Sequence, residues 1–150
     1  MAITPDKHWS HLAGEYFVAA ELCRRGYSVA MTLGNAKAID LFAEHDGHTV
    51  NVQVKAISRR KNIGWPMMQD RVTSGVIYVF VCLNEPPDAP TYFIATAEEA
   101  RVNVKQHSSR GIIDLTTLRN DQFVGRWDKI EAALTTGTHH VADRTRRGSS

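Results

Sequence analysis

The chain has 150 residues, of which 43% are hydrophobic and 23% charged, values that are ordinary for a soluble globular protein of one domain. Its longest apolar run, residues 76–83, is too short to span a bilayer, and no apolar segment near the N-terminus predicts a secretory signal. The formal net charge of +2 comes largely from the arginines after residue 143, so net charge neither predicts nor excludes a nucleic-acid partner.

The first half of the chain predicts one helix followed by three strands. The helix is expected to begin at a cap formed by Thr4 or Asp6, because apolar residues then recur at spacings of three and four. A short strand over residues 27–33 follows. A hairpin over residues 38–56 comes next, and its expected turn is Asp46-Gly47, because both residues tolerate the positive φ of a tight turn.

The second half begins with a long connection and then alternates strands and helices. Residues 58–74 predict an irregular loop, and residues 76–83 predict a central strand that is buried on both faces. A strand over residues 91–95 and a helix over residues 96–106, opened by a capping box of Thr96 and Glu99, follow. A short strand at residues 111–115 and a last helix from Asn120 or Asp121 to Gly137 complete the set, the buried stripe of that helix being Phe123, Trp127, Ile130 and Leu134.

These elements predict an α/β or α+β sandwich built on a mixed sheet. Residues 1–137 are expected to form a single domain, and residues 138–150 a basic, disordered tail. Cys23 and Cys82 both lie among apolar residues, which predicts two buried free thiols rather than a disulfide or a metal pair. A reducing, cytoplasmic location is the expectation that follows.

The hairpin is the segment with the most chemical content. With a loop of two or four residues centred on Asp46-Gly47, cross-strand partners have numbers that sum to 93, so Asp40 is expected directly opposite Gln53. Lys55 is then the next residue on the same face, diagonal to Asp40. A three-residue loop would instead send Asp40 and Gln53 to opposite faces. The alternative is an ordinary solvated strand face, but aspartate is depleted in strand interiors.

Three convergent polar groups of this kind suit metal-assisted hydrolysis. A carboxylate and an amide carbonyl one strand spacing apart can share Mg²⁺, which takes oxygen ligands, and a bound ion lowers the pKa of its water. Lys55 would orient or deprotonate that water. A third acid is available on the first helix, at Glu15 or Glu21. His11, one turn before Glu15, is expected either to contact that carboxylate or a phosphate, or to be a plain surface histidine.

The order of these residues resembles the PD-(D/E)XK nuclease superfamily. Glu15 lies on a first helix, Ile39-Asp40 on a strand and Gln53-Val54-Lys55 on the next, similar to the Q-x-K form of Mrr-like nucleases, and the helix-first order is similar to archaeal Holliday-junction resolvases. The resemblance implies a restriction-endonuclease-like αβββαβ core, with a mixed central sheet flanked by helices. It also implies that Glu15, Asp40 and Gln53 are metal ligands and that Lys55 is the catalytic lysine. Gln53 departs from the acidic residue of the motif and removes one negative charge.

By this resemblance the chain is predicted to be a Mg²⁺-dependent endonuclease, with Mn²⁺ as a substitute, acting on DNA rather than RNA. A domain of this size has little surface for sequence recognition, which favours a homodimer or a structure-selective substrate. Basic residues expected to contact nucleic-acid phosphates are Arg59, Arg60, Lys61 and Lys37. Trp65 is expected either to stack on a base or to pack within its loop.

Two further functions remain open on the sequence alone. The first is a catalytically inactive nuclease-like scaffold that binds nucleic acid or a protein partner. The second is a module that binds only protein, for which no DNA binding is expected. Metal binding separates an enzyme from an inactivated scaffold, because a degenerate site should not hold a divalent cation.

Overall fold

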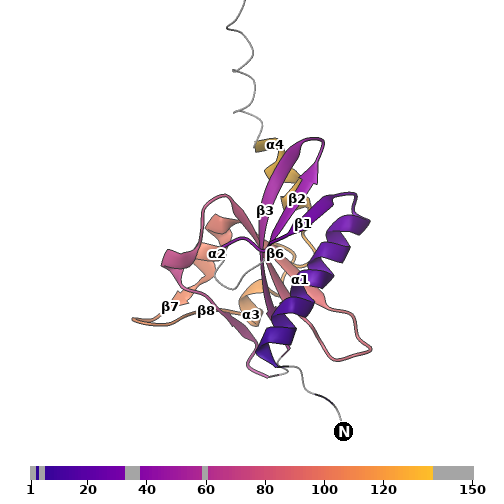
Figure 1. The fold of residues 1–150 in the computed structure, drawn as a ribbon. Coiled ribbons are helices and arrows are strands. Elements are labelled where there is room, and N and C mark those ends of the chain that lie inside the picture. Colours follow the sequence, from indigo (N-terminus) through magenta and orange to yellow (C-terminus); the bar gives the residue numbers. More distant parts are fainter. Residues whose placement is uncertain (1–2, 4–5, 33–37, 59–60, 137–150) are drawn as a thin grey trace, which may run out of the picture.

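The computed structural model describes residue 3 and residues 6–32, 38–58 and 61–136; the predicted tail lies outside these residues. A five-stranded sheet forms the centre, and helix α1 and the small sheet at β7 and β8 lie on opposite sides of it (Figure 1). Helix α1 (Lys7–Arg24) begins as predicted, because the Asp6 side chain accepts a hydrogen bond from the N–H of Trp9 at 3.0 Å. Among the described helices, none is long and apolar enough to cross a membrane.

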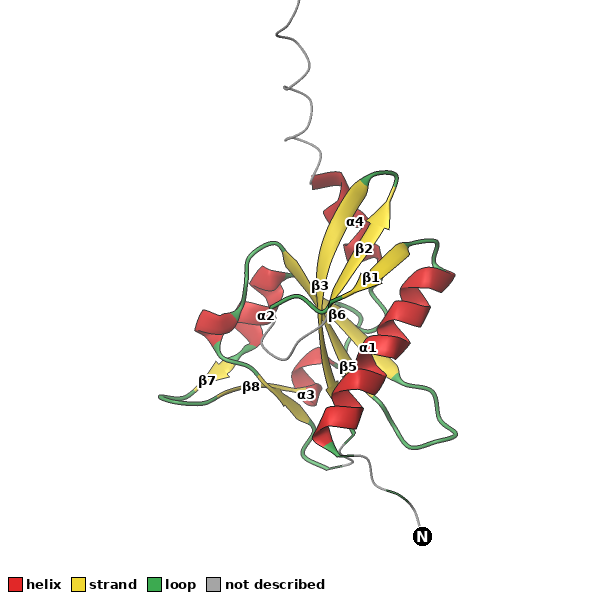
Figure 2. Cartoon of the chain, in the orientation of Figure 1, coloured by secondary structure: helices red, strands yellow, loops and turns green. Residues whose placement is uncertain are grey.

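The central sheet is mixed, as predicted. Its order is β1 (Ser28–Met31), β2 (Leu41–His45), β3 (His48–Ile57), β5 (Val76–Cys82) and β6 (Thr91–Ala95), with β3 and β5 parallel and the other neighbours antiparallel. Every residue of β5 is buried, which confirms the prediction of a central strand covered on both faces. Figure 2 shows the strands of this sheet fanning out from one another, which is the twist expected of a sheet.

The connection between β3 and β5 contains more structure than predicted. It holds strand β4 (Gly64–Pro66) and a 3₁₀ helix, η1 (Gln69–Arg71). Strand β4 pairs with β8 (Gly111–Asp114), which also pairs with β7 (Lys105–Gln106), and these three strands form a second sheet. Trp65 is 1% exposed, and its ring lies edge-on to the rings of Phe80 and Phe93. The packing alternative for Trp65 is therefore confirmed.

The C-terminal helices differ from the prediction at their ends. Helix α2 (Ala97–Asn103) has the predicted capping box, but it ends before Gln106, because β7 pairs with β8. A short helix, α3 (Leu115–Leu118), was not predicted. Helix α4 (Asp128–Thr136) begins later than predicted, because the carbonyl of Phe123 accepts from the N–H of Ile94 and Gly125 has a φ of +62°. The four residues of its predicted stripe are all buried.

The two faces of the central sheet have separate apolar cores. One core joins the sheet to α1 and α4, with Leu22, Val52 and Ile130 among its fully buried residues. The other joins the sheet to β4, β8, α2 and α3 around Trp65 and Phe80. Helix α1 comes unusually close to β3 at Gly14, where an added Cβ would lie 2.3 Å from the Cβ of Ala56. This close approach holds the next residue, Glu15, against the sheet.

Both described cysteines are free thiols, as predicted. Cys82 is buried at the end of β5, and burial raises its pKa to about 11. Cys23 is exposed, so the prediction that it is buried was wrong. Its apolar neighbours in sequence lie on other faces of α1, and the side chain of Cys23 is on the solvent side.

Candidate active site

The hairpin has the register predicted from an even loop. Strands β2 and β3 pair from Leu41 with Val52 to His45 with His48, and each pair of numbers sums to 93. Asp46 and Gly47 form the two-residue loop, with φ values of +50° and +77°. This is the backbone conformation for which an Asp-Gly pair is suited, and it brings the start of β2 beside the end of β3.

Asp40 lies one residue before this ladder, in a β-bulge. Its N–H donates to the carbonyl of Val52 at 2.9 Å, although Val52 is already the partner of Leu41. Two residues of one strand thus face one residue of the other, an arrangement that turns a side chain away from its regular direction. The predicted direct pairing of Asp40 with Gln53 is therefore not formed. That prediction was wrong because it extended an ideal ladder one residue past its end.

The bulge buries the Asp40 carboxylate and gives it a backbone partner. The residue is 2% exposed, and its Oδ2 accepts a hydrogen bond from the N–H of Val54 at 2.8 Å. The carbonyl of Asp40 accepts from the N–H of Thr32 at 3.0 Å, just after β1. Asp40 is thus held from both neighbouring strands, while its Oδ1 is directed toward helix α1 and lies 4.0 Å from Nε2 of His11.

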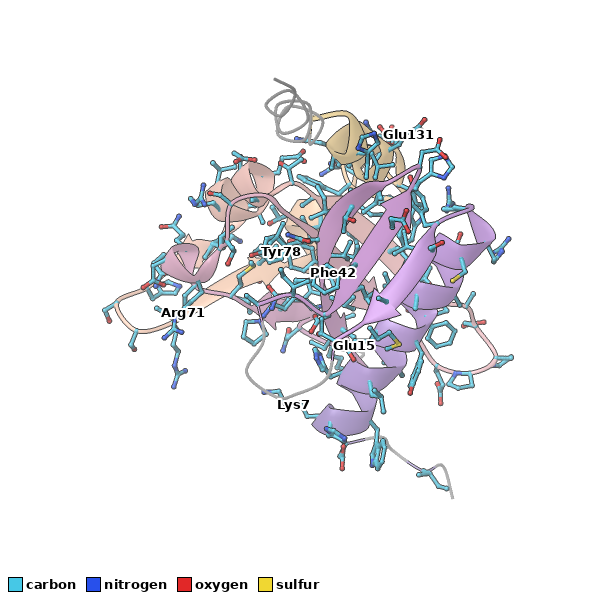
Figure 3. The ribbon with its side chains drawn as sticks, turned by 45° about the horizontal axis from the view of Figure 1, so that its top comes forward. Lys7, Glu15, Phe42, Arg71, Tyr78 and Glu131 are labelled. Carbon is cyan, nitrogen blue, oxygen red and sulfur yellow. The ribbon has the colours of Figure 1, made fainter. Side chains whose placement is uncertain are left out.

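Helix α1 brings a second buried carboxylate and a histidine to the same place. Glu15 is 4% exposed, and its Oε1 lies 3.3 Å from Nε2 of His11, one turn earlier. Ligand atoms of His11, Glu15 and Asp40 all lie within 4.8 Å of one another. Figure 3 shows Glu15 on the side of α1 that meets the strands. Of the two expectations for His11, contact with the Glu15 carboxylate is confirmed, and the i, i+4 spacing was its signal in the sequence.

Lys55 lies near this group of acids and is half-buried. Burial is the main cause that lowers the pKa of its ammonium group, and Lys7 lowers it further, whereas the charge of Asp40 raises it. The Asp40 carboxylate is therefore close enough to act on the charge of Lys55. The net result favours the neutral amine more than in an exposed lysine, which is the form that accepts a proton.

Gln53 and Lys55 both line a pocket of about 490 Å³ between β3 and the second sheet. The side chain of Gln53 is half-buried and makes no hydrogen bond to another residue in the described part of the chain. Its amide is thus available to a ligand on this side of the strand. That Gln53 is a metal ligand stays a prediction.

The residues at the centre of the site fit a divalent cation. Two carboxylates buried within 4.8 Å of each other repel unless a positive charge lies between them. Their oxygens are hard donors of the kind that Mg²⁺ prefers, and an imidazole nitrogen beside them also suits Mn²⁺. Of the predicted phosphate contacts, Lys61 is exposed, and Arg59, Arg60 and Lys37 lie outside the described residues.

Comparison with known proteins supports the fold that the motif implied. No family model matches the chain, and no curated protein does. Among solved structures, the bacterial homing endonuclease I-Ssp6803I is similar with a TM-score of 0.58 and 16% identity, over 89% of this chain and 95% of that one. Hjc, a Holliday junction resolvase from Archaeoglobus fulgidus, matches with a TM-score of 0.48 and 13% identity, over 72% of this chain and 86% of its own. The chain has a restriction-endonuclease-like fold, a mixed central sheet flanked by helices, as the resemblance predicted.

Proposed function

We propose that this chain is a Mg²⁺-dependent endonuclease that hydrolyses phosphodiester bonds in DNA. The observation that carries the proposal is the meeting of two buried carboxylates, Glu15 and Asp40, beside a lysine whose pKa is lowered by burial. A buried pair of carboxylates is costly to a fold unless a cation or a shared proton offsets their repulsion, and burying a lysine also costs stability. The similarity in fold to a homing endonuclease is consistent with this function.

Each residue has a role that its surroundings support. Glu15 and Asp40 would hold Mg²⁺ or Mn²⁺, with Gln53 as a further oxygen ligand and His11 as a neighbouring imidazole. When bound, the ion lowers the pKa of a coordinated water and polarises the phosphate. The N–H of Val54 keeps the Asp40 carboxylate in place. Lys55 orients the attacking water, accepts its proton as a neutral amine, and as an ammonium offsets the charge that grows on the phosphate.

A cleavage assay tests the proposal directly. Linear, branched and single-stranded DNA are incubated with the chain and Mg²⁺ or Mn²⁺, and the same assay is run with Asp40→Asn combined with Lys55→Ala. We expect metal-dependent cleavage by the parent and a loss of at least about a hundredfold in the double variant. The matched control is Asp46→Asn, an exposed turn residue whose replacement removes one charge and keeps the turn. Absence of cleavage, or a double variant as active as the parent, contradicts the proposal.

One observation favours a second function, an inactive scaffold of the nuclease type. Gln53 stands where the motif has an acid, so the site has one negative charge fewer with which to hold a cation. Calorimetric titration with Mg²⁺ and Mn²⁺ separates the two functions, because the scaffold should bind neither ion. The nucleic-acid contacts of Arg59, Arg60, Lys61 and Lys37, and the homodimer, stay predictions under either function.

A further inference from the structure

The pocket beside Lys55 has a second wall that the sequence did not predict. One wall is β3, with Gln53 and Lys55, and the other is formed by β4, η1 and the loop between β7 and β8. At about 490 Å³ the pocket lies within the range of ordinary ligand sites, roughly 300–1,000 Å³. Gln53 and Lys55 flank Val54 in β3, and the N–H of Val54 binds the Asp40 carboxylate, so the pocket adjoins the group of acids described above.

The charged residues that line this pocket are all basic. They are Lys55, Arg71 and Arg110, and no acid is among the lining residues. Arg71 and Arg110 are exposed, and neither guanidinium makes a hydrogen bond or ion pair to another residue within the described ranges. Elsewhere, by contrast, Arg24, Arg25 and Arg126 pair with acids. Two unpaired guanidinium groups on one side of a pocket are complementary to an anionic ligand with repeated charges.

The wall that carries these two arginines is built to hold them in place. The N–H of Gln69 donates to Oε1 of Gln106 at 3.1 Å, and the N–H of Met67 donates to the carbonyl of Gly111 at 3.0 Å. Gly111 permits this contact, because a Cβ there would lie 2.0 Å from the carbonyl oxygen of Met67. These bonds join the segment that contains η1 to strands β7 and β8, so Arg71 and Arg110 lie on connected parts of one wall. In Figure 3, Arg71 lies across the strands from α1 and Glu15.

Most of the remaining lining is apolar, with Met68 and Ile112 among its residues, and Gln53 and Ser109 are its polar residues. Apolar side chains between basic ones suit a polymer that presents sugars between its phosphates. A free phosphate or a small anion would use the guanidinium groups and leave this lining uncovered.

We propose that this pocket is the track for one DNA strand leaving the active site, with Arg71 and Arg110 contacting phosphates next to the scissile bond. The inference rests on the proposed function, because it places the DNA strand in the pocket that Lys55 also lines. The sequence had suggested Arg59, Arg60, Lys61 and Lys37 as phosphate contacts. The pocket adds a second nucleic-acid surface, formed by Arg71 and Arg110 beside the second sheet. Its contacts are to the backbone, so they give affinity and register rather than base recognition.

Binding without cleavage tests this surface separately from catalysis. Fluorescence anisotropy of a labelled DNA duplex and of a single strand is measured in EDTA at about 50, 100 and 200 mM salt. The variants are Arg71→Gln and Arg110→Gln, alone and together, with Arg71→Lys and Arg110→Lys as versions that keep the charge. The matched control is Arg24→Gln, since Arg24 is at the far end of α1 and pairs with Glu21. Thermal melting confirms that each variant is folded.

We expect each glutamine variant to weaken binding about fivefold for every DNA sequence and to reduce the slope of log K against log salt by about 0.9. The lysine variants should keep the slope, and Arg24→Gln should match the parent. The proposal is overturned if the parent does not bind DNA, if Arg71→Gln and Arg110→Gln bind like Arg24→Gln, or if RNA alone is bound. If the parent and the variants bind DNA as expected but the parent cleaves no DNA in Mg²⁺ or Mn²⁺, the proposed function is contradicted and the binding surface is still supported.

Discussion

The N–H of Val54 donates to Oδ2 of Asp40 at 2.8 Å, and this bond sets the position of a carboxylate that is almost completely buried. The bond predicts different effects for two substitutions. Asparagine still offers an oxygen to Val54, whereas Asp40→Ala leaves a buried N–H without an acceptor. We expect the alanine variant to have a free energy of unfolding about 1–3 kcal/mol lower than the asparagine variant, measured by urea denaturation in EDTA.

The comparison of these two variants removes the effect of charge, because both lack the negative charge that repels Glu15. Equal stability of Asp40→Asn and Asp40→Ala would mean that the bond to Val54 contributes nothing in solution.

Gln53→Glu restores the acid that the motif lacks, and its effect reveals what Gln53 contacts. If Gln53 is a metal ligand, the added charge should strengthen Mg²⁺ binding about tenfold in calorimetric titration, a gain of about 1.4 kcal/mol. The matched control is Asn51→Asp, which adds the same charge two residues earlier on the same strand. An unchanged Mg²⁺ affinity combined with weaker DNA binding would instead place Gln53 on the DNA strand in the pocket.

Much of this site could be predicted from the sequence because its determinants are local. Asp46-Gly47 defines the turn, the turn defines the register, and the motif identifies Glu15, Asp40 and Lys55. The bulge at Asp40 could not be predicted, because an extra residue in an alternating run leaves no local mark. The bulge depends on how Asp40 is held by the Val52 carbonyl and the Val54 N–H of the other hairpin strand, which alternation alone does not specify.

The second sheet could not be predicted for a related reason. Strands β4 and β7 are very short, and β4 pairs with β8, which lies far along the chain: Trp65 is opposite Ile113. Periodicity is not visible in two or three residues, so residues 58–74 predicted a loop. The predicted start of α4 was wrong for a different reason. The helical spacing of buried residues begins before the helix, in turns that include Gly125.

Gly14→Ala should loosen the contact between α1 and β3. A Cβ at residue 14 would lie 2.3 Å from the Cβ of Ala56, so the helix must move and take Glu15 with it. Overpacking of this kind costs roughly 1–3 kcal/mol, partly offset by about 1 kcal/mol from the better helix propensity of alanine. We expect a lower free energy of unfolding and weaker Mg²⁺ binding. Adding Ala56→Gly should recover both, and a double variant no better than Gly14→Ala would contradict this explanation.

Cys82 should report on unfolding through its reactivity. In a Cys23→Ser background, a thiol reagent at about pH 8 should label Cys82 only when the chain unfolds, since the buried thiol has its pKa raised to about 11. From pH 9 to 11 the unfolded chain has released this proton and the folded chain has not, so stability should fall as pH rises through that window. Cys82→Ala should show a shallower fall. Rapid labelling of the folded chain would contradict burial.

Lys55→Met should reduce cleavage and increase the free energy of unfolding. Burial lowers the pKa of Lys55, so the folded chain carries its charge at a cost that an exposed lysine does not have. Below the lowered pKa of Lys55, both the folded and the unfolded states are protonated, and methionine removes the whole cost. As pH rises from the folded pKa toward 10.5, the folded chain releases its proton first, the parent gains stability, and the advantage of methionine shrinks. We expect cleavage to fall about a hundredfold or more while the free energy of unfolding in EDTA at pH 7 increases.

Lys61→Met, at an exposed position, should change the stability little. A Lys55→Met variant less stable than the parent at pH 7 would mean that the attraction to Asp40 outweighs burial, and that Lys55 is kept for the fold.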